Sequence, residues 1–165
     1  MKNDDPSSVE SCLTEVVIPK ENAVFWMDGR GRWKNRHGRF EHKRIIDYFN
    51  RSIRRDEDGY YVTQVRGDIR EKVYFPFEDT PLFIVRIILQ APLRLFLNTG
   101  ETMPLDPTAL FVEADQLYHL RGDERIKFSD HALLAMAPLL DEGADGFSIR
   151  IGDRTWLIPD RCPLP

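Results

Sequence analysis

The sequence has few of the residues that mark a metal site. Only two of its 165 residues are cysteine, Cys12 and Cys162, and neither has a second Cys or His at zinc-site spacing. We therefore expect no bound metal and two free thiols in a reducing compartment. The residues alone leave a disulfide between Cys12 and Cys162 open.

Long hydrophobic runs are also missing. The most apolar stretch, 82–89, is interrupted by Arg86 and is much shorter than the roughly 20 residues that cross a bilayer. The first residues lack the basic and apolar regions of a secretory signal. We expect a soluble, cytoplasmic protein with no membrane partner.

Catalytic motifs are absent too. The sequence contains no Gly-x-Ser-x-Gly elbow, no His-Glu-x-x-His pair and no phosphate-binding Gly-rich loop that leads to Lys-Ser/Thr. The four histidines are scattered, which is typical of surface or capping positions: His37, His42, His119 and His131. We expect no catalytic residue, no cofactor and no enzyme activity.

Positive charge, by contrast, is concentrated in one segment. The chain is 42% hydrophobic and 30% charged, as globular proteins are, and its net charge is only -4. Residues 30–55 contain ten Lys or Arg and two acidic residues, so this segment carries +8 and the rest of the chain -12. Clustered positive charge attracts anions and neutralises phosphates, which points to an anionic partner.

The first half of the chain predicts strands around one helix. We expect a flexible arm over 1–20, and then a strand at 24–27 that turns at Asp28-Gly29 into a second strand. Four basic residues alternate along this second strand: Arg30, Arg32, Lys34 and Arg36. A helical stripe follows Phe40 and ends before Gly59, with Ile45, Ile46, Phe49 and Ile53 on one face. Further strands are expected at 60–65, 73–77, 82–90 and 93–97.

The second half repeats this pattern. A strand at 110–112 and another at 125–128 lead to a helix that Ser129 caps, and Pro138 should kink or end that helix. We expect the helix to stop within 141–146 and strands to follow at 147–151 and 156–158. Phe40 and Phe128 each precede an apolar helix residue by five positions, Ile45 and Leu133, which is the spacing of a hydrophobic staple.

These patterns predict an α+β fold with two similar strand-helix-strand units and mostly antiparallel sheets. We place the flexible arm at 1–20, the first repeat unit at 21–91 and the second at 92–165. Within the first unit, Arg54-Arg55 lie beside the aromatic pair Tyr60-Tyr61. This combination suits a phosphate attached to a base or ring, because Arg binds phosphate bidentately and aromatic rings stack on bases.

Two strings of residues carry a family resemblance. Arg54 to Tyr61 read Arg-Arg-Asp-Glu-Asp-Gly-x-Tyr, and Glu78 to Pro81 read Glu-Asp-x-Pro. In this order they resemble a bacterial family of uncharacterised proteins, domain of unknown function 1285, over residues 32–159. The chain departs from the family pattern at Val65 to Arg70, where extra residues suggest a loop that reshapes one wall of a pocket.

The resemblance implies a duplicated core whose second half is loosely like a pleckstrin-homology barrel. It also implies a pocket between the two halves for a nucleotide-like ligand, and a part in signal transduction. By motif, five residues would lie near this pocket: Arg54, Arg55, Asp58, Glu78 and Asp79. We add Tyr60 to this predicted site as the neighbouring aromatic residue. The alternative is that Arg54-Arg55 and Glu78-Asp79 only pair with each other.

We therefore expect a non-enzymatic ligand-binding or signalling module. Its ligand is expected to be small and anionic, with a nucleotide as the leading class, and to bind between the two halves. The alternative is a nucleic-acid-binding protein that uses the basic segment 30–55, with Trp and Tyr side chains as stacking platforms.

Overall fold

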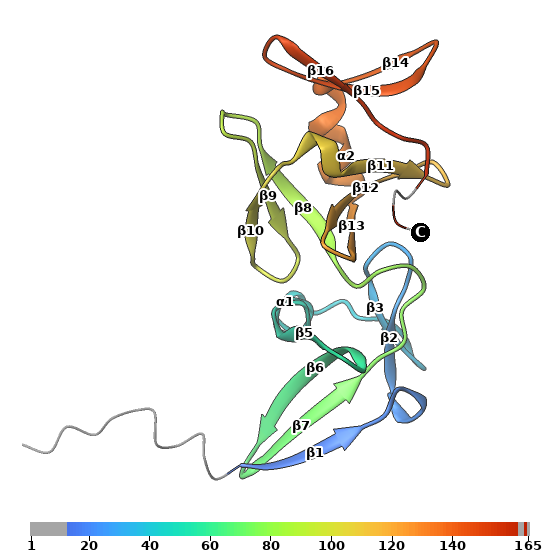
Figure 1. Ribbon diagram of the computed structural model, residues 1–165. Helices are drawn as coiled ribbons and strands as arrows, with labels where there is room; N and C mark the ends of the chain where they lie inside the picture. Colours follow the sequence, from blue (N-terminus) through green and yellow to red (C-terminus); the bar gives the residue numbers. More distant parts are fainter. Residues whose placement is uncertain (1–12, 162–163, 165) are drawn as a thin grey trace, which may run out of the picture. The chain divides into compact units, whose positions relative to one another are not determined.

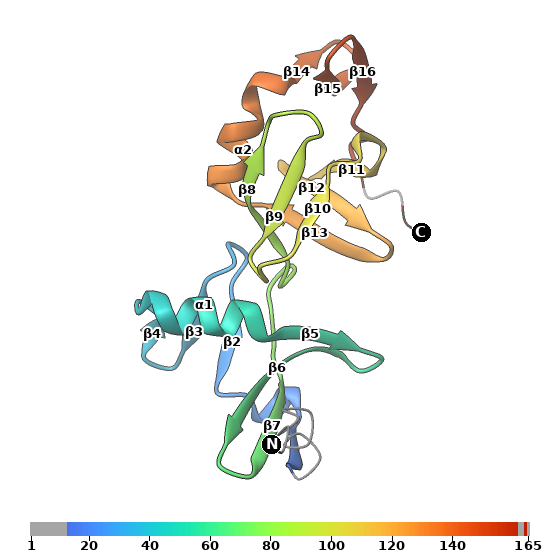
Figure 2. The same cartoon turned by 90° about the vertical axis from the view of Figure 1, so that its left-hand side faces the viewer.

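The computed structural model describes residues 13–161 and 164, and these form two compact units (Figure 1, Figure 2). The first unit contains 13–27 and 33–76, and the second contains 28–32 together with the described residues from 77 onward. Strands dominate both units, and their pairing is antiparallel except between β1 and β7 and between β8 and β13. The predicted α+β class is confirmed. Cys12 and Cys162 lie outside the described residues.

The first unit combines two small sheets with one helix. In chain order its elements are β1 (Thr14–Ile18), the 3-10 helix η3 (Lys20–Asn22), β2 (Phe25–Met27), β3 (Trp33–Asn35), β4 (Gly38–Arg39), α1 (Lys43–Ser52), β5 (Ile53–Asp56), β6 (Gly59–Arg66) and β7 (Ile69–Tyr74). One sheet has the order β2-β3-β4 and the other the order β1-β7-β6-β5.

Aromatic side chains fill the core of the first unit. The ring centre of Phe49 on α1 lies 4.9 Å from that of Phe25 and 5.2 Å from that of Trp33. Trp33 also packs against Phe75, which is fully buried. The indole Nε1 of Trp33 donates to Oδ1 of Asn50 at 2.8 Å, so the buried N–H has an acceptor and α1 is held to the sheet.

The second unit is built on a larger sheet. Its elements are β8 (Phe83–Ile88), β9 (Arg94–Leu97), β10 (Thr102–Pro104), η4 (Pro107–Ala109), β11 (Leu110–Glu113), β12 (Gln116–Arg121), β13 (Glu124–Phe128), α2 (Asp130–Met136), η5 (Ala137–Leu139), β14 (Leu140–Gly143), β15 (Gly146–Ile151) and β16 (Arg154–Leu157). The six-stranded sheet has the order β10-β9-β8-β13-β12-β11, and the remaining three strands form the sheet β14-β15-β16. The helix α2 packs against β8 (Figure 2).

Both predicted helices end earlier than the sequence pattern suggested. Ile53 continues the apolar spacing of α1, yet it begins β5 and pairs with Val62, and both side chains are buried. Gly59 does not end the helix, because it is the first residue of β6, directly after the turn at Glu57-Asp58, with a φ of 123°. In the second unit, α2 ends at Met136, next to the 3-10 helix that holds Pro138, as predicted for that proline.

The division of the chain also differs from the predicted boundaries. Residues 14–18 of the predicted arm form β1, which pairs in parallel with β7. The units divide at Pro76–Phe77 rather than at 91–92, because β8 pairs with β13 and with β9 in the second unit. The predicted loop over 65–70 is instead the end of the β6–β7 hairpin, with its turn at Gly67-Asp68.

Candidate functional site

Four of the predicted site residues lie on the β5–β6 hairpin of the first unit. Arg55 and Tyr60 are cross-strand partners, and the guanidinium carbon of Arg55 lies 5.4 Å from the centre of the Tyr60 ring. Arg54 donates through Nη1 to the carbonyl oxygens of Arg51 and Ile53, each at 2.8 Å. Asp58 is in the turn, where its backbone N–H donates to the carboxylate of Asp56.

Asp56 belongs to a charged cluster that the sequence reading missed. Its Oδ2 accepts from Tyr74 at 2.7 Å and from Lys72, whose ammonium lies 4.3 Å from the centre of the Tyr61 ring. The hydrogen bond from Lys72 lowers the pKa of Asp56, while burial raises the pKa of Tyr74. These groups satisfy one another across β5, β6 and β7, so the cluster ties the sheet together.

Glu78 and Asp79, the other two predicted site residues, lie in the second unit just before β8. Oε2 of Glu78 accepts from the backbone N–H of Gly29 at 2.8 Å. Oδ2 of Asp79 accepts from the hydroxyl of Tyr118 at 2.6 Å and from Nζ of Lys127 at 3.1 Å. Both carboxylates therefore bind donors of their own unit.

Around Asp79 the second unit gathers a half-buried set of charged and aromatic groups. Arg125 lies between Asp79, at 3.6 Å, and Glu113, at 2.6 Å, and its guanidinium carbon is 4.6 Å from the centre of the Tyr118 ring. Burial, together with the bond to Asp79, raises the pKa of Tyr118 to about 12. Tyr118 therefore stays protonated at neutral pH and acts as a hydrogen-bond donor.

The loop 28–32 is fastened to this cluster. Oδ1 of Asp28 accepts from the backbone N–H groups of Arg30 and Arg32, and Oδ2 accepts from Nε of Arg32 at 2.8 Å. Nζ of Lys127 donates to the carbonyl oxygen of Gly29 at 2.8 Å. Arg30 and Arg32 thus belong to a structured loop, and the predicted alternation along one strand is wrong because β3 contains only residues 33–35.

Gly31 allows the loop to approach β8 closely. Its φ of 77° is in the left-handed region, and a Cβ at this position would lie 2.9 Å from the ring of Phe83. A residue with a side chain would have to move that buried ring. The conformation of the loop therefore depends on glycine here.

A polar cavity of about 230 Å³ lies beside this loop, within the second unit. Its lining combines the loop residues Gly29 and Arg30 with the end of β13, the start of α2 and single residues of β8 and β12: Phe83, Gln116, Lys127, Phe128, Ser129 and Asp130. Lys127 uses two of its three N–H donors on Gly29 and Asp79. The guanidinium of Arg30 makes no hydrogen bond or ion pair with the described residues.

Sequence reasoning found Glu78 and Asp79 by motif, but it missed the residues that surround them. Tyr118 and Lys127 are directly opposite each other on β12 and β13. The available signal was the alternation of Arg125 and Lys127 on a predicted strand, which indicates one charged strand face. The hydrogen bond from Lys127 to Gly29 spans 98 residues, and no local pattern encodes it.

Metal and membrane features are not found in the described part of the chain. No group of three His, Cys, Asp or Glu side chains there could hold a metal ion. Neither α1 nor α2 has the length and apolar character that a membrane-crossing helix requires.

Comparison with known proteins shows a likeness in structure but not in sequence. No family model matches the chain, and no curated protein matches its sequence. A DUF1285 family protein from Silicibacter pomeroyi DSS-3 matches with a TM-score of 0.56 and 12% identity, over 93% of this chain and 87% of that chain. A DUF1285 family protein from Shewanella baltica OS155 matches with a TM-score of 0.51 and 17% identity, over 72% of this chain and 94% of that chain. The resemblance read from the motifs is therefore confirmed at the level of structure, and the chain has the fold of DUF1285 family proteins.

Proposed function

We propose that this protein is a non-catalytic signalling module that binds a small anionic ligand, with a nucleotide as the ligand class. The observation that carries the proposal is the polar cavity of the second unit, which Arg30 and Lys127 line. Arg30 supplies a guanidinium that has no hydrogen-bond or ion-pair partner within the described part of the chain, and Lys127 retains one N–H donor. Such donors bind phosphate oxygens through charge-assisted hydrogen bonds.

The other lining residues favour a nucleotide over a bare anion. Asp130 offers a carboxylate that accepts hydrogen bonds from ribose hydroxyl or base amino groups, and Gln116 offers both a donor and an acceptor. Phe83 and Phe128 are buried and add a small apolar part to the wall. The volume of about 230 Å³ is below the roughly 300–1,000 Å³ of most ligand pockets, so the cavity would enclose part of a mononucleotide.

A thermal-shift and calorimetric panel of inorganic phosphate and nucleoside phosphates tests this function. We expect at least one nucleotide to raise the unfolding midpoint of the wild type. Arg30→Ala should weaken binding by about ten- to a hundredfold, as expected for the loss of a charged hydrogen bond.

Arg55→Ala is the matched control, because it removes a predicted ligand residue of the first unit and leaves the cavity intact. We expect it to bind like the wild type. Loss of binding in Arg55→Ala but not in Arg30→Ala would move the site to the β5–β6 hairpin. If neither phosphate nor any nucleotide binds the wild type, the proposed function is wrong. Phosphoester hydrolysis that is lost in Glu78→Gln would contradict the non-catalytic part.

We also propose that the two units are diverged copies of one ancestral unit. The element order β2-β3-β4-α1-β5-β6-β7 matches β11-β12-β13-α2-β14-β15-β16. Gly59 and Gly146 each begin the second strand of the hairpin that follows the helix, β6 and β15, and both have a positive φ. On this proposal the second unit, with its six-stranded sheet, is the half that resembles a pleckstrin-homology barrel. An experimental structure in which these seven-element segments fail to superpose would contradict the duplication.

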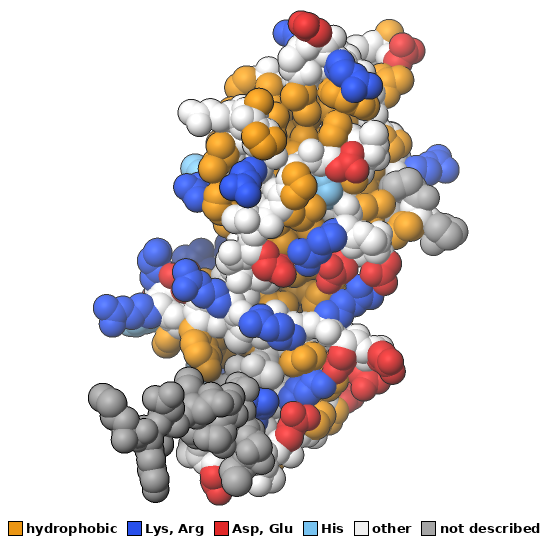
Figure 3. All heavy atoms as spheres, turned by 60° about the vertical axis from the view of Figure 1, so that its left-hand side comes forward, with side chains coloured by type: hydrophobic (Ala, Val, Ile, Leu, Met, Phe, Trp, Pro, Cys, Tyr) orange, Lys and Arg blue, Asp and Glu red, His pale blue; other side chains and the backbone are white. Residues whose placement is uncertain are grey.

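Nucleic-acid binding is the second candidate, and a basic surface on the first unit favours it. Five exposed basic residues of this unit lie on and around β4 and α1: Arg36, Arg39, Lys43, Arg44 and Arg51. Figure 3 shows Lys and Arg side chains gathered on this part of the surface. Asp47 pairs with Lys43 at 3.5 Å. Single-stranded RNA or DNA should then be retarded in a gel at low salt and released as salt rises. Absence of a retarded band at low salt would exclude this candidate.

A further inference from the structure

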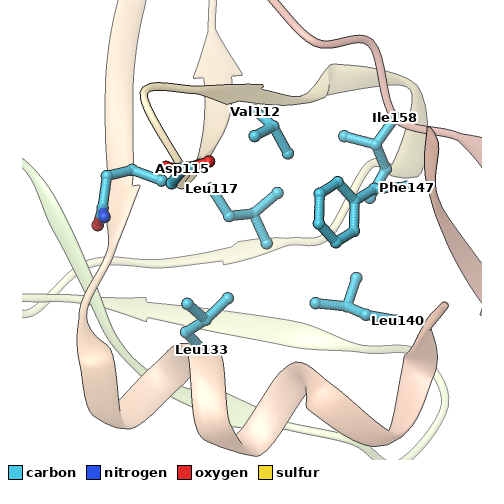
Figure 4. A pocket seen from close by; sticks show the side chains of 8 residues that line it. Val112, Asp115, Leu117, Leu133, Leu140, Phe147 and Ile158 are labelled. Carbon is cyan, nitrogen blue, oxygen red and sulfur yellow. The ribbon is translucent and has the colours of Figure 1, made fainter. Parts of the chain in front are cut away.

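A second cavity, of about 130 Å³, lies within the second unit and is almost entirely apolar. Figure 4 shows side chains from three parts of the unit converging on it. Of the apolar side chains, Val112 and Leu117 come from the β11–β12 hairpin and Leu133 comes from α2. The other three come from the C-terminal sheet and the segment after it: Leu140, Phe147 and Ile158. The cavity is partly open to solvent, so a ligand can enter without unfolding of the unit.

Backbone hydrogen bonds hold the walls of this cavity in place. The N–H of Ile158 donates to the carbonyl oxygen of Phe147 at 2.8 Å, and the N–H of Val112 donates to that of Pro159 at 2.9 Å. These bonds link the C-terminal segment to β15 on one side and to β11 on the other. Because the walls are fixed by backbone contacts, the cavity exists before any ligand binds, and a preformed site loses little affinity to reorganisation.

One charged group stands at the rim. Asp115 lies in the two-residue turn between β11 and β12, where Ala114 and Asp115 have φ values of 48° and 59°. Its carboxylate makes no hydrogen bond or ion pair with the described residues. The turn therefore presents an acceptor at one end of an apolar space (Figure 4).

We propose that this cavity binds a small apolar molecule about the size of one six-membered ring, with an amine or other hydrogen-bond donor at one end. Apolar cavities of about 150 Å³ bind molecules such as benzene. A donor at the rim would pair with Asp115, whereas an anionic group there would be repelled by it. This site is separate from the anion-binding function, although Gln116 lines both cavities.

Three probes of similar shape test the chemistry: toluene, benzylamine and benzoate. They are titrated into the full chain while methyl NMR signals of Leu117, Leu133 and Leu140 are followed. We expect saturable shifts with toluene and benzylamine, with benzylamine binding about two- to fivefold more tightly, as for an exposed ion pair. Benzoate should bind most weakly. Asp115→Asn should remove the preference for benzylamine over toluene.

A pair of neighbouring substitutions tests the location. Leu133→Trp fills the cavity and should weaken toluene binding at least tenfold, whereas Leu134→Trp changes a side chain that is 75% exposed and should leave it unchanged. Arg30→Ala should leave it unchanged as well. Leu133→Ala is the second variant, for use if Leu133→Trp does not fold. It enlarges the cavity, so this variant should bind ethylbenzene more tightly than the wild type does.

The proposal is overturned if toluene causes no saturable shift, if benzoate binds best, or if Leu133→Trp and Leu134→Trp bind alike. Unchanged selectivity in Asp115→Asn would overturn the role of the carboxylate.

Discussion

At the scale of single residues, His119 is the buried histidine of this chain, while His37, His42 and His131 are exposed. Its Nε2 accepts from the backbone N–H of Asp106 at 3.1 Å, so the proton of the neutral ring lies on Nδ1. Nδ1 has no partner among the described residues. Burial lowers the pKa of His119 below its usual 6.5, against the opposing effect of the Asp106 carboxylate.

This burial predicts a loss of stability at mildly acidic pH. Below pH 6.5 the unfolded chain protonates His119 whereas the folded chain resists protonation, so the unfolded state binds more protons and the free energy of unfolding falls. The slope attributable to His119 is at most about 1.4 kcal/mol per pH unit, between 6.5 and the lowered pKa. Denaturant unfolding between pH 7 and 5.5 measures it.

Two variants isolate the contribution of His119. His119→Gln keeps an acceptor for the Asp106 N–H and removes the titrating ring, so its stability should change less over this pH range than that of the wild type. His37→Gln, at an exposed position, should retain the slope of the wild type. Parallel pH profiles for the wild type and His119→Gln would show that His119 does not titrate on unfolding in this range.

At the scale of helices and strands, local chemistry predicted where elements begin better than where they end. Ser129 was predicted to cap α2, and its hydroxyl oxygen accepts from the N–H of Ala132. The apolar stripe through Phe49 predicted α1. Ile53 extends that stripe by the spacing i to i+4, but pairing with Val62 buries it in β5, and helical spacing alone cannot reveal such a partner.

The candidate site was predictable only in part, for the same reason. Motif resemblance pointed to Glu78 and Asp79, which hold the loop 28–32 and Lys127. Arg30 was predicted as one charge of a basic segment and placed on a strand, whereas it lies in the loop before β3. Its place beside Lys127 depends on the pairing of β8 with β13 and on Gly31 lying against Phe83, and both are contacts between distant parts of the sequence.

At the scale of the whole molecule, each unit is completed by a segment far away in the sequence. In the first unit, β1 pairs with β7, which begins more than 50 residues later. In the second unit, the segment after β16 returns to β11, where the N–H of Val112 donates to the carbonyl oxygen of Pro159. Hydrophobic periodicity identifies elements but carries no information about which of them pair, so these closures were not predicted.

The closure of the second unit should contribute measurably to its stability. Ile158 is 5% exposed, and its own N–H bonds to β15 while the next residue, Pro159, accepts from β11. Ile158→Ala removes this buried side chain and should lower the free energy of unfolding by about 2–5 kcal/mol. Leu157→Ala is the matched control: Leu157 is 64% exposed, and its loss should cost about 0.5 kcal/mol or less.

Amide exchange of Val112 supplies a local readout of the same contact. The N–H of Val112 donates to the carbonyl oxygen of Pro159, so it should exchange faster in Ile158→Ala than in the wild type and in Leu157→Ala. Equal stability of the two variants would mean that the C-terminal segment does not support the fold, and that the apolar cavity lacks the wall that Ile158 provides.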